Sequence, residues 1–200
     1  MTVPDLRLGS CPDSWGVWFA DEFDATGSMY NIAEYIEITG PLDLGLLGDA
    51  VRRTLTEAEA VHVRCGESDD GPWQTVFEPR DRGADVVVRL DLSHEADPMA
   101  AARAWMDADL ATPVDLRGDK HLFTVALFTL GPERHIWYHR YHHLLVDGYG
   151  GWLLARRAGQ IYTALRQGLE IPQSPFGSLA ELLREDADYR ASVTPTQDGE

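Results

Sequence analysis

The second half of the chain constrains the fold most, because its pattern changes there from strand to turn, back to strand and then to helix. Two runs rich in β-branched and aromatic residues, 122–130 and 135–142, flank a Gly-Pro-Glu-Arg turn signal, which predicts a hairpin. Residues 149–167 carry apolar residues at helical spacing and are followed by Gly168, a residue typical of a helix C-terminus. The short segment after the second strand is therefore predicted to be a loop that leads from a strand into a helix.

The rest of the chain alternates between strand and helix patterns. Strands are predicted at Tyr30–Thr39, Val61–Cys65, Trp73–Phe77 and Asp85–Leu92. Helices are predicted after Pro12 and at Leu42–Ala60, Pro98–Ala111 and Leu179–Ala191. Residues 168–178 contain two prolines and are typical of a linker. This order of elements indicates an α/β fold.

The composition favours a globular protein that does not bind polyanions such as nucleic acid. The 200 residues are 44% hydrophobic, enough to bury a substantial core in one domain or one large lobe. Seventeen basic against 33 acidic residues give a formal charge of −16, which repels nucleic acid and anionic membranes. The sequence has two cysteines, no signal-peptide pattern and no apolar run of membrane-spanning length, so we expect a cytoplasmic protein.

The chemistry lies in the loop segment His142-His143-Leu144-Leu145-Val146-Asp147-Gly148. Successive strand residues point to opposite faces, so His142 and His143 cannot bind one ligand if the strand reaches them. His135, His139 and His143 share a face, but each lies four residues, about 13 Å, from the next, too far for one zinc ion. The pattern therefore argues against a metal site, and His135 and His139 are better explained as packed core residues.

His143 is the better placed histidine for acid-base chemistry, because it lies next to the loop. A neutral imidazole takes a proton from an attacking hydroxyl, thiol or amine, or returns one. Asp147 either orients this histidine, as in a catalytic triad, or pairs with an arginine and fixes the loop. Arg64 and Arg140 are the candidate partners within the chain. The spacing alone leaves both alternatives open.

The glycines around Asp147 suggest backbone roles. Gly148 indicates a conformation or a close approach that a side chain would block. Gly150-Gly151, at the expected helix start, would present amide groups to an oxyanion. The sequence contains no G-x-S-x-G nucleophile elbow and no reactive-cysteine context. We therefore predict direct acyl transfer between two bound substrates, without a covalent acyl-enzyme.

With its His-His-x-x-x-Asp-Gly motif, the chain resembles the condensation domains of nonribosomal peptide synthetases, which have a chloramphenicol-acetyltransferase-like fold. Within that family, Trp137-Tyr138-His139-Arg140-Tyr141 and Thr56-Glu57-Ala58-Glu59-Ala60 look most similar to the serine-activating enterobactin synthetases. Trp18-Phe19 is similar to the end of the family's first motif. Val61-His62-Val63-Arg64-Cys65 is similar to the second motif, with His62 where an arginine is usual.

The resemblance implies that residues 1–200 form the N-terminal lobe of a two-lobe domain, a mixed sheet with flanking helices, and that the C-terminal lobe lies outside these residues. In this family, an aminoacyl thioester on one carrier protein attacks an acyl or peptidyl thioester on another, and an amide bond forms. His143 carries over as the principal catalytic residue beside His142. Gly148 carries over as a loop or oxyanion residue, and Asp147 as mainly structural.

The resemblance also implies the partners. These are the donor and acceptor carrier proteins, the C-terminal condensation lobe and an adenylation domain. The 4'-phosphopantetheine arms arrive on the carriers, so no cofactor is expected to be held permanently. Two alternatives stay open: another acyltransferase of the same superfamily that uses a free alcohol or amine, and a non-catalytic lobe that only docks a carrier protein.

Overall fold

The computed structural model describes residues 12–69, 71–76, 86–118 and 120–193. The strands are β1 (Asn31–Thr39), β2 (Val63–Ser68), β3 (Gly71–Val76), β4 (Val87–Asp91), β5 (Phe123–Gly131) and β6 (Arg134–His142). The helices are α1 (Pro12–Glu22), α2 (Leu44–Glu57), the 3-10 helix η1 (Glu59–His62), α3 (Pro98–Leu110), α4 (Gly148–Gln167) and α5 (Leu179–Val193). The predicted helices and strands are observed, but Val61 and His62, predicted as the start of a strand, belong to η1 instead. Phe77 and Asp85, at two predicted strand ends, lie outside the described residues.

Four strands form the main sheet in the order β1-β6-β5-β4. β6 runs antiparallel to both of its neighbours, while β4 is parallel to β5. A parallel pair needs a crossover connection, and α3 lies in the connection from β4 to β5. β2 and β3 form a separate antiparallel pair. The mixed sheet is thus confirmed, and β6, the strand that leads to the histidine pair, is hydrogen-bonded along both edges.

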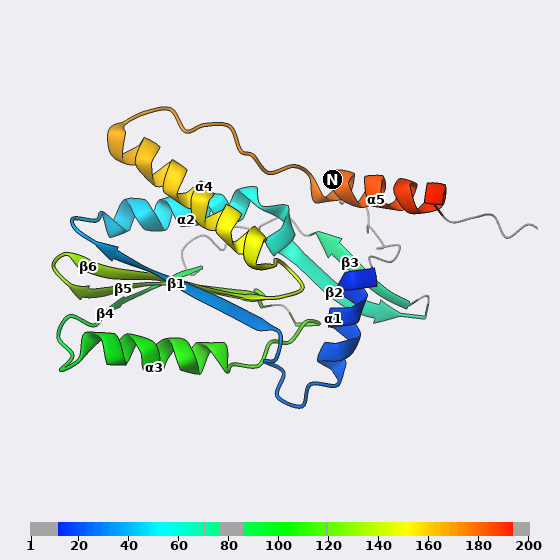
Figure 1. Ribbon diagram of the computed structural model, residues 1–200, viewed down its shortest axis with the longest axis horizontal. Coiled ribbons are helices and arrows are strands. Elements are labelled where there is room, and N and C mark those ends of the chain that lie inside the picture. Colours follow the sequence, from blue (N-terminus) through cyan, green and yellow to red (C-terminus); the bar gives the residue numbers. More distant parts are fainter. Residues whose placement is uncertain (1–11, 70, 77–85, 119, 194–200) are drawn as a thin grey trace, which may run out of the picture.

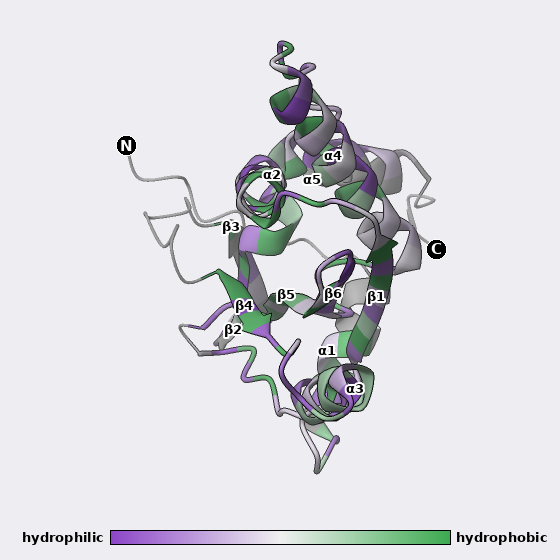
Figure 2. Ribbon diagram, turned by 90° about the vertical axis from the view of Figure 1, so that its left-hand side faces the viewer, coloured by the Kyte–Doolittle hydropathy of each residue, from purple (hydrophilic) through white to green (hydrophobic). Residues whose placement is uncertain are grey.

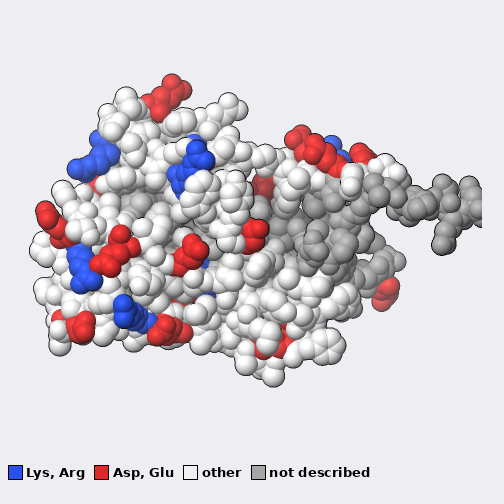
Figure 3. All heavy atoms as spheres, viewed as in Figure 1, with Lys and Arg blue, Asp and Glu red and all other residues white. Residues whose placement is uncertain are grey.

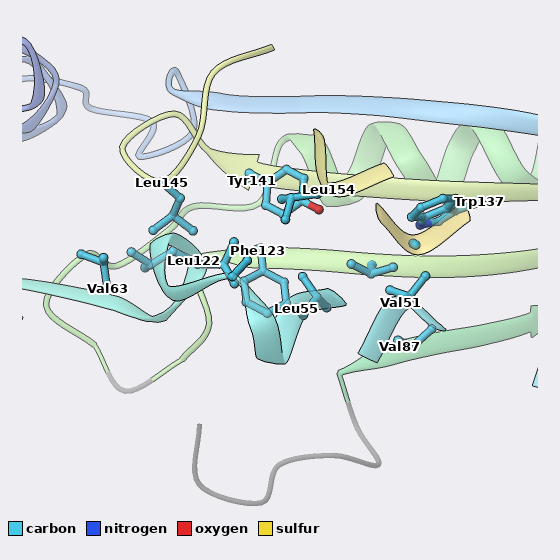
Figure 4. Packing of buried hydrophobic residues seen from close by; sticks show 14 of the residues in the cluster. Val51, Leu55, Val63, Val87, Leu122, Phe123, Trp137, Tyr141, Leu145 and Leu154 are labelled. Carbon is cyan, nitrogen blue, oxygen red and sulfur yellow. The ribbon is translucent and has the colours of Figure 1, made fainter. Parts of the chain in front are cut away.

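Helices cover both faces of the main sheet, with α2 and α4 side by side over one face and α3 under the other (Figures 1 and 2). The larger apolar cluster includes Leu55, Trp137 and Leu154 and is seen from close by in Figure 4. The smaller cluster, which includes residues of α3, contains Phe128 and Ile136. Ile136 and Trp137 are neighbours in β6 but belong to different clusters, as alternation requires in a strand buried on both faces.

The helix predicted at Leu42–Ala60 ends earlier than expected, at Glu57. Ala58 has extended backbone angles, φ −97° and ψ 94°, and the chain continues as η1. The His62 side chain explains the stop, because its Nε2 lies 2.7 Å from the carbonyl oxygen of Leu55 in the last turn of α2. Apolar spacing continues across this stop in the sequence, so periodicity alone does not reveal it.

A segment without helix or strand, residues 169–178, leads from α4 to α5 and is called the strap below (Figure 1). Arg157 of α4 has 1% of its side chain exposed and pairs with Glu57 of α2 at 2.7 Å. The same guanidinium donates to the carbonyl oxygens of Pro172 at 2.9 Å and Gln173 at 3.4 Å. One buried charge therefore fastens the strap to both helices of the upper layer.

The charged side chains are mixed over the visible surface. On the face shown in Figure 3, acidic and basic groups are interspersed. None of the helices within the described ranges combines the length and the apolar character that crossing a membrane requires.

Candidate functional site

His142 is the last residue of β6, and its side chain is fully buried. Its amide donates to the Leu122 carbonyl at 2.8 Å, and its carbonyl accepts from the Leu145 amide at 2.9 Å. Ring Nδ1 accepts from the Leu144 amide at 3.2 Å. Ring Nε2 lies 3.3 Å from carboxylate Oδ1 of Asp21, in the last turn of α1. The backbone and both ring nitrogens of His142 are therefore all engaged.

The surroundings of His142 favour a neutral ring. Burial is the largest influence and lowers the pKa of His142 below its ordinary value of 6.5. The charges of His143 and Arg140 lower this pKa further, while the Asp21 carboxylate opposes them. A neutral ring also suits the contact with the Leu144 amide, because Nδ1 accepts a hydrogen bond only when it carries no proton.

His143 lies in the turn directly after β6, and its side chain is exposed. Its backbone amide donates to the carbonyl of Tyr30, the residue before β1, at 2.8 Å. The two adjacent histidines thus differ as strand alternation predicts, with one ring inside the lobe and the other at its surface. His143 is the one that a second molecule can reach from solvent.

The loop after the histidine pair is anchored by Leu145. This side chain is 8% exposed and belongs to the larger apolar cluster. Figure 4 shows it pointing into the cluster near Leu122 and Val63. Burying a leucine side chain contributes about 2 kcal/mol, so the loop has its own apolar attachment between the strand and the helix.

Asp147 is exposed and occupies the N-cap position of α4. Its Oδ1 accepts from the Gly150 amide at 2.7 Å, and its carbonyl accepts from the Gly151 amide at 2.9 Å. This capping contact is a third role, beyond the two that the motif spacing suggested. Because both glycine amides serve the helix start, the prediction that Gly150-Gly151 faces an oxyanion is wrong.

Gly148 is the first residue of α4 and is exposed. Among the described glycines, positive φ angles occur at Gly27, Gly40 and Gly168, not here. A Cβ added to Gly148 would meet no atom within 4 Å apart from its chain neighbours and the backbone of its own helix. The predicted backbone requirement is therefore wrong for the described part of the chain, and a contact of Gly148 with substrate stays a prediction.

Arg140 is buried, with 5% of it exposed, on the α3 side of β6. Its Nε donates to Asp109 at 2.7 Å, and its Nη2 donates to Thr124 at 2.7 Å. Its Nη1 donates to Asn31 at 3.2 Å. With the guanidinium engaged there, the prediction that Arg140 pairs with Asp147 is wrong. Alternation is the physical reason, because it directs Arg140 away from the α4 side of the sheet.

Arg64, the other predicted partner of Asp147, lies on β2 opposite Thr75 and is partly buried. Its pairing with Asp147 stays a prediction. His135 and His139 are 5% and 2% exposed, which confirms their interpretation as packed core residues.

An apolar cavity of about 400 Å³ lies beside the loop. Val146 and Gly150 line it from the site, and Phe176 and Leu179 line it from the strap and α5. Glu59, which also lines the cavity, accepts from the Leu179 amide at 2.8 Å and thereby caps the start of α5. The far end of the strap is therefore packed next to the histidine loop.

Sequence reasoning missed three acidic side chains that hold the site and its surroundings. Asp21 contacts His142 from 121 residues away, and Asp109 contacts Arg140 from 31 residues away. Neither leaves a local signal. The sequence did contain a signal for the Glu57 contact. Arg157 follows Leu154 at helical spacing on the apolar stripe of α4, where an unpaired charge is not expected, so an acidic partner could have been predicted.

Cys65 is a buried free cysteine. Burial raises the pKa of the Cys65 thiol to about 12, so the reactive thiolate is scarce at neutral pH. Cys11 lies outside the described residues. Across 12–69, 71–76, 86–118 and 120–193, no three histidine, cysteine or acidic side chains gather closely enough to hold a metal ion.

Comparisons with known proteins agree on one family. The Condensation domain family model matches residues 15–194. The dimodular nonribosomal peptide synthase of Bacillus subtilis (strain 168) is 46% identical over 188 residues, 94% of this chain and 8% of that protein. Enterobactin synthase component F of Escherichia coli O157:H7 is 34% identical over 177 residues, 88% of this chain and 14% of that protein.

Solved structures confirm the α/β, chloramphenicol-acetyltransferase-like lobe. The starter condensation domain of rhizomide synthetase RzmA is 37% identical, with a TM-score of 0.80, over 89% of this chain and 42% of that one. The chain thus spans less than half of that matched structure and a small part of the curated relatives. The enterobactin protein is a more distant relative than the dimodular synthase, so the comparisons support the family rather than the predicted serine-activating type.

Proposed function

The chain belongs to the condensation domain family, and we propose that it supplies the histidine-bearing lobe of a catalyst that forms amide bonds in nonribosomal peptide biosynthesis. The observation that carries this proposal is the contrast within the histidine pair. His142 is fixed inside the lobe, and this presents the exposed His143 at the end of a doubly paired strand.

In the proposed reaction, the α-amine of an aminoacyl thioester attacks the carbonyl carbon of an acyl or peptidyl thioester. A C–N bond forms, the C–S bond breaks, and the donor sulfur leaves as a thiolate. His143 takes the proton that the amine loses and returns it to this thiolate, or holds the amine in line while the proton passes from the amine to the sulfur. Asp147 caps α4 at 2.7 Å and keeps the loop that carries His143 in one conformation. Gly148, whose missing Cβ faces open space, lets a substrate approach the helix start.

The proposal includes groups outside these 200 residues. We assign residues 1–200 to the N-terminal lobe and expect a C-terminal lobe to form the opposite wall of the site. The family resemblance implies two lobes, and a chain that covers 42% of the matched structure fits one of them. Donor and acceptor carrier proteins would bring the two thioesters on 4'-phosphopantetheine arms, and an adenylation domain would load the acceptor. On this basis the isolated lobe folds but condenses poorly.

Replacing His143 with Ala in the complete gene product tests the proposal. We expect amide formation to fall roughly 10²-fold or more, as for loss of a general base or of an amine-positioning group. The measurement is single-turnover product formation from preloaded donor and acceptor carriers, which separates condensation from loading. His94→Ala is the matched control, because His94 is also exposed but lies after β4. A His143→Ala protein that condenses as fast as the wild type would refute the catalytic role and leave a docking lobe.

The finer likeness to serine-activating enterobactin synthetases is a proposal about substrates. It rests on the resemblance of residues 137–141 and 56–60 to those synthetases, which would imply a serine-like acceptor with an aryl or hydroxyaryl donor, and enterobactin synthase component F is among the relatives. A panel of donor thioesters, offered with seryl and other aminoacyl acceptors, tests it. Equal rates for seryl and unrelated acceptors would remove the siderophore-type assignment, and transfer to free amines or alcohols would favour the other acyltransferase type.

A further inference from the structure

The last turn of α1 and the connection from it to β1 hold both histidines of the pair. In the last turn of α1, the Asp21 carboxylate lies 3.3 Å from Nε2 of His142. The connection runs from there to Tyr30. At its end, the Tyr30 carbonyl accepts from the His143 amide at 2.8 Å. The turn between them is organised by Asp24, which accepts from the amides of Thr26, Ser28 and Met29 at 2.8 to 2.9 Å. A segment more than 100 residues away in sequence is therefore built around the histidine pair.

The contacts of the His142 ring assign its tautomer. Nδ1 faces the Leu144 amide, which only donates, so Nδ1 carries no proton. The proton of the neutral ring is then on Nε2, where it points at Oδ1 of Asp21. The His142 side chain is 0% exposed and that of Asp21 is 12% exposed, so water competes weakly for this contact.

The ring connects α1 to the backbone of the catalytic loop. Leu144 follows His143 directly, and its amide is held by Nδ1 of His142. A rotation of the ring about its Cβ–Cγ bond would withdraw this acceptor and free the peptide group between His143 and Leu144. Asp21 opposes such a rotation, because it offers Nε2–H an acceptor in one ring orientation only.

We propose that Asp21 is a positioning residue for the reaction at His143, acting through the His142 ring on the Leu144 peptide group. The inference rests on the proposed function, since it concerns the direction in which the His143 imidazole leaves the strand. It goes beyond the motif, because Asp21 lies outside it and touches no reacting atom.

Substitutions at Asp21 test the inference in the complete gene product. Asp21→Ala removes the acceptor, and we expect the single-turnover condensation rate to fall roughly 10-fold or more, since small displacements at a reacting centre carry costs of this size. The KM for the carrier-bound substrates should stay within about twofold, because no substrate group is removed. Asp21→Asn keeps an oxygen at the same place and should restore the rate to within about threefold of the wild type.

Two controls separate positioning from stability. Asp43→Ala removes the side chain that caps α2 through the Leu46 amide at 2.9 Å, so it should lower the melting temperature without lowering the condensation rate. Nitrogen-15 NMR of the histidines in the 200-residue chain should show His142 as the Nε2–H tautomer at neutral pH, with His142→Gln identifying the signal. The NMR measurement does not depend on the proposed reaction.

The outcomes are distinct. Wild-type rates for Asp21→Ala, in a protein that His143→Ala inactivates, would overturn the positioning role and leave the proposed function intact. Equal losses of rate in Asp21→Ala, Asp21→Asn and Asp43→Ala would also overturn it, because the effect would follow stability alone. An Nδ1–H or doubly protonated His142 would overturn the assigned geometry. Full activity of His143→Ala would refute the proposed function itself.

Discussion

The two faces of β6 differ in whether their buried polar side chains have hydrogen-bond partners. On the α3 side, Tyr138 and Arg140 both donate to Asp109, and His142 faces Asp21. On the α2 and α4 side, the ring nitrogens of His135, Trp137 and His139 are buried, and none of them has a hydrogen-bond partner among the described residues.

Polar residues therefore have two different roles in this one strand, anchoring on one face and filling space on the other. The paired face fixes where the strand ends and how the loop begins, because each group there is matched with an acid from another element. The unpaired face uses its rings as apolar bodies that fill space against the upper helices, with Trp137 packed edge-to-face on His139 at 5.7 Å. His139 is an intermediate case, because its Nε2 lies 3.5 Å from a Glu34 oxygen, at the outer limit of hydrogen-bond distance.

The largest effect is expected on the paired face, from Arg140→Met. The substitution leaves the Asp109 carboxylate, 13% exposed, without its cation, and breaking a buried pair in this way costs about 3–5 kcal/mol. Urea unfolding of the 200-residue chain measures the change in the free energy of unfolding. The double variant Arg140→Met, Asp109→Leu should recover much of the loss, because it removes both charges together. A single variant as stable as the wild type would show that the paired face is not an anchor.

Acidification should weaken the fold through buried histidines on both faces. Burial lowers the pKa values of His62, His139 and His142 below 6.5, although neighbouring carboxylates oppose the shift. Below pH 6.5 these histidines bind protons in the unfolded chain but stay neutral in the folded chain. The free energy of unfolding that the neutral rings contribute is therefore fully present above about pH 6.5 and falls as the pH drops towards 5.

Each unit of lowered pKa corresponds to about 1.4 kcal/mol of this effect. Urea unfolding at several pH values between 7 and 5 measures it. The variant His139→Phe removes one of the three groups and should flatten the dependence. A stability that rises on acidification over this range would contradict the neutral state of these rings.

Asp147→Ala should have a smaller effect, because Asp147 lies beyond the strand and belongs to neither face. Loss of an N-cap side chain costs about 0.5–2 kcal/mol, which is less than the 3–5 kcal/mol expected for breaking a buried ion pair. Thermal unfolding should show a decrease of a few degrees, roughly 2–4 °C per kcal/mol for a chain of this size. Asp147→Asn, which retains a capping oxygen, is the control. A loss as large as that of Arg140→Met would instead indicate a buried partner such as Arg64.

The smallest effect is expected on the unpaired face, from His135→Phe. His135 is 5% exposed and both of its ring nitrogens are buried without hydrogen bonds in the described structure. Removing two unsatisfied polar atoms offsets the cost of fitting a larger ring, so stability should change by no more than about 1 kcal/mol in either direction. A loss above about 2 kcal/mol would mean that His135 makes polar contacts after all.

Sequence predicted those parts of the molecule whose signals are local. The β5–β6 hairpin follows from two β-branched and aromatic runs around a Gly-Pro turn, and α4 is followed by Gly168, whose φ of 64° is left-handed. The contrast between His142 and His143 needed only strand geometry. The end of α2 was placed too late, because it depends on the His62 ring, which contacts Leu55 seven residues earlier.

The contacts that give the site its shape were not predictable in the same way. Asp21 and Asp109 come from distant helices, and a single sequence does not record which acid meets which base. The motif spacing also led to the wrong prediction that the Gly150 and Gly151 amides face an oxyanion. A free amide and an amide that is hydrogen-bonded in a helix cap cannot be distinguished in the sequence. Local pattern therefore located the candidate site, while the contacts that hold its residues required the tertiary structure.

Arg157 has a consequence for protein engineering. A chimera that joins this lobe to a foreign partner needs a crossover point, and residues 169–178 look suitable because they form neither helix nor strand. Their carbonyls at Pro172 and Gln173 nevertheless satisfy a guanidinium that is 1% exposed. A splice there would leave the buried Arg157 cation with half of its acceptors. The strap should therefore be kept together with α2 and α4, and the safer crossover lies after α5.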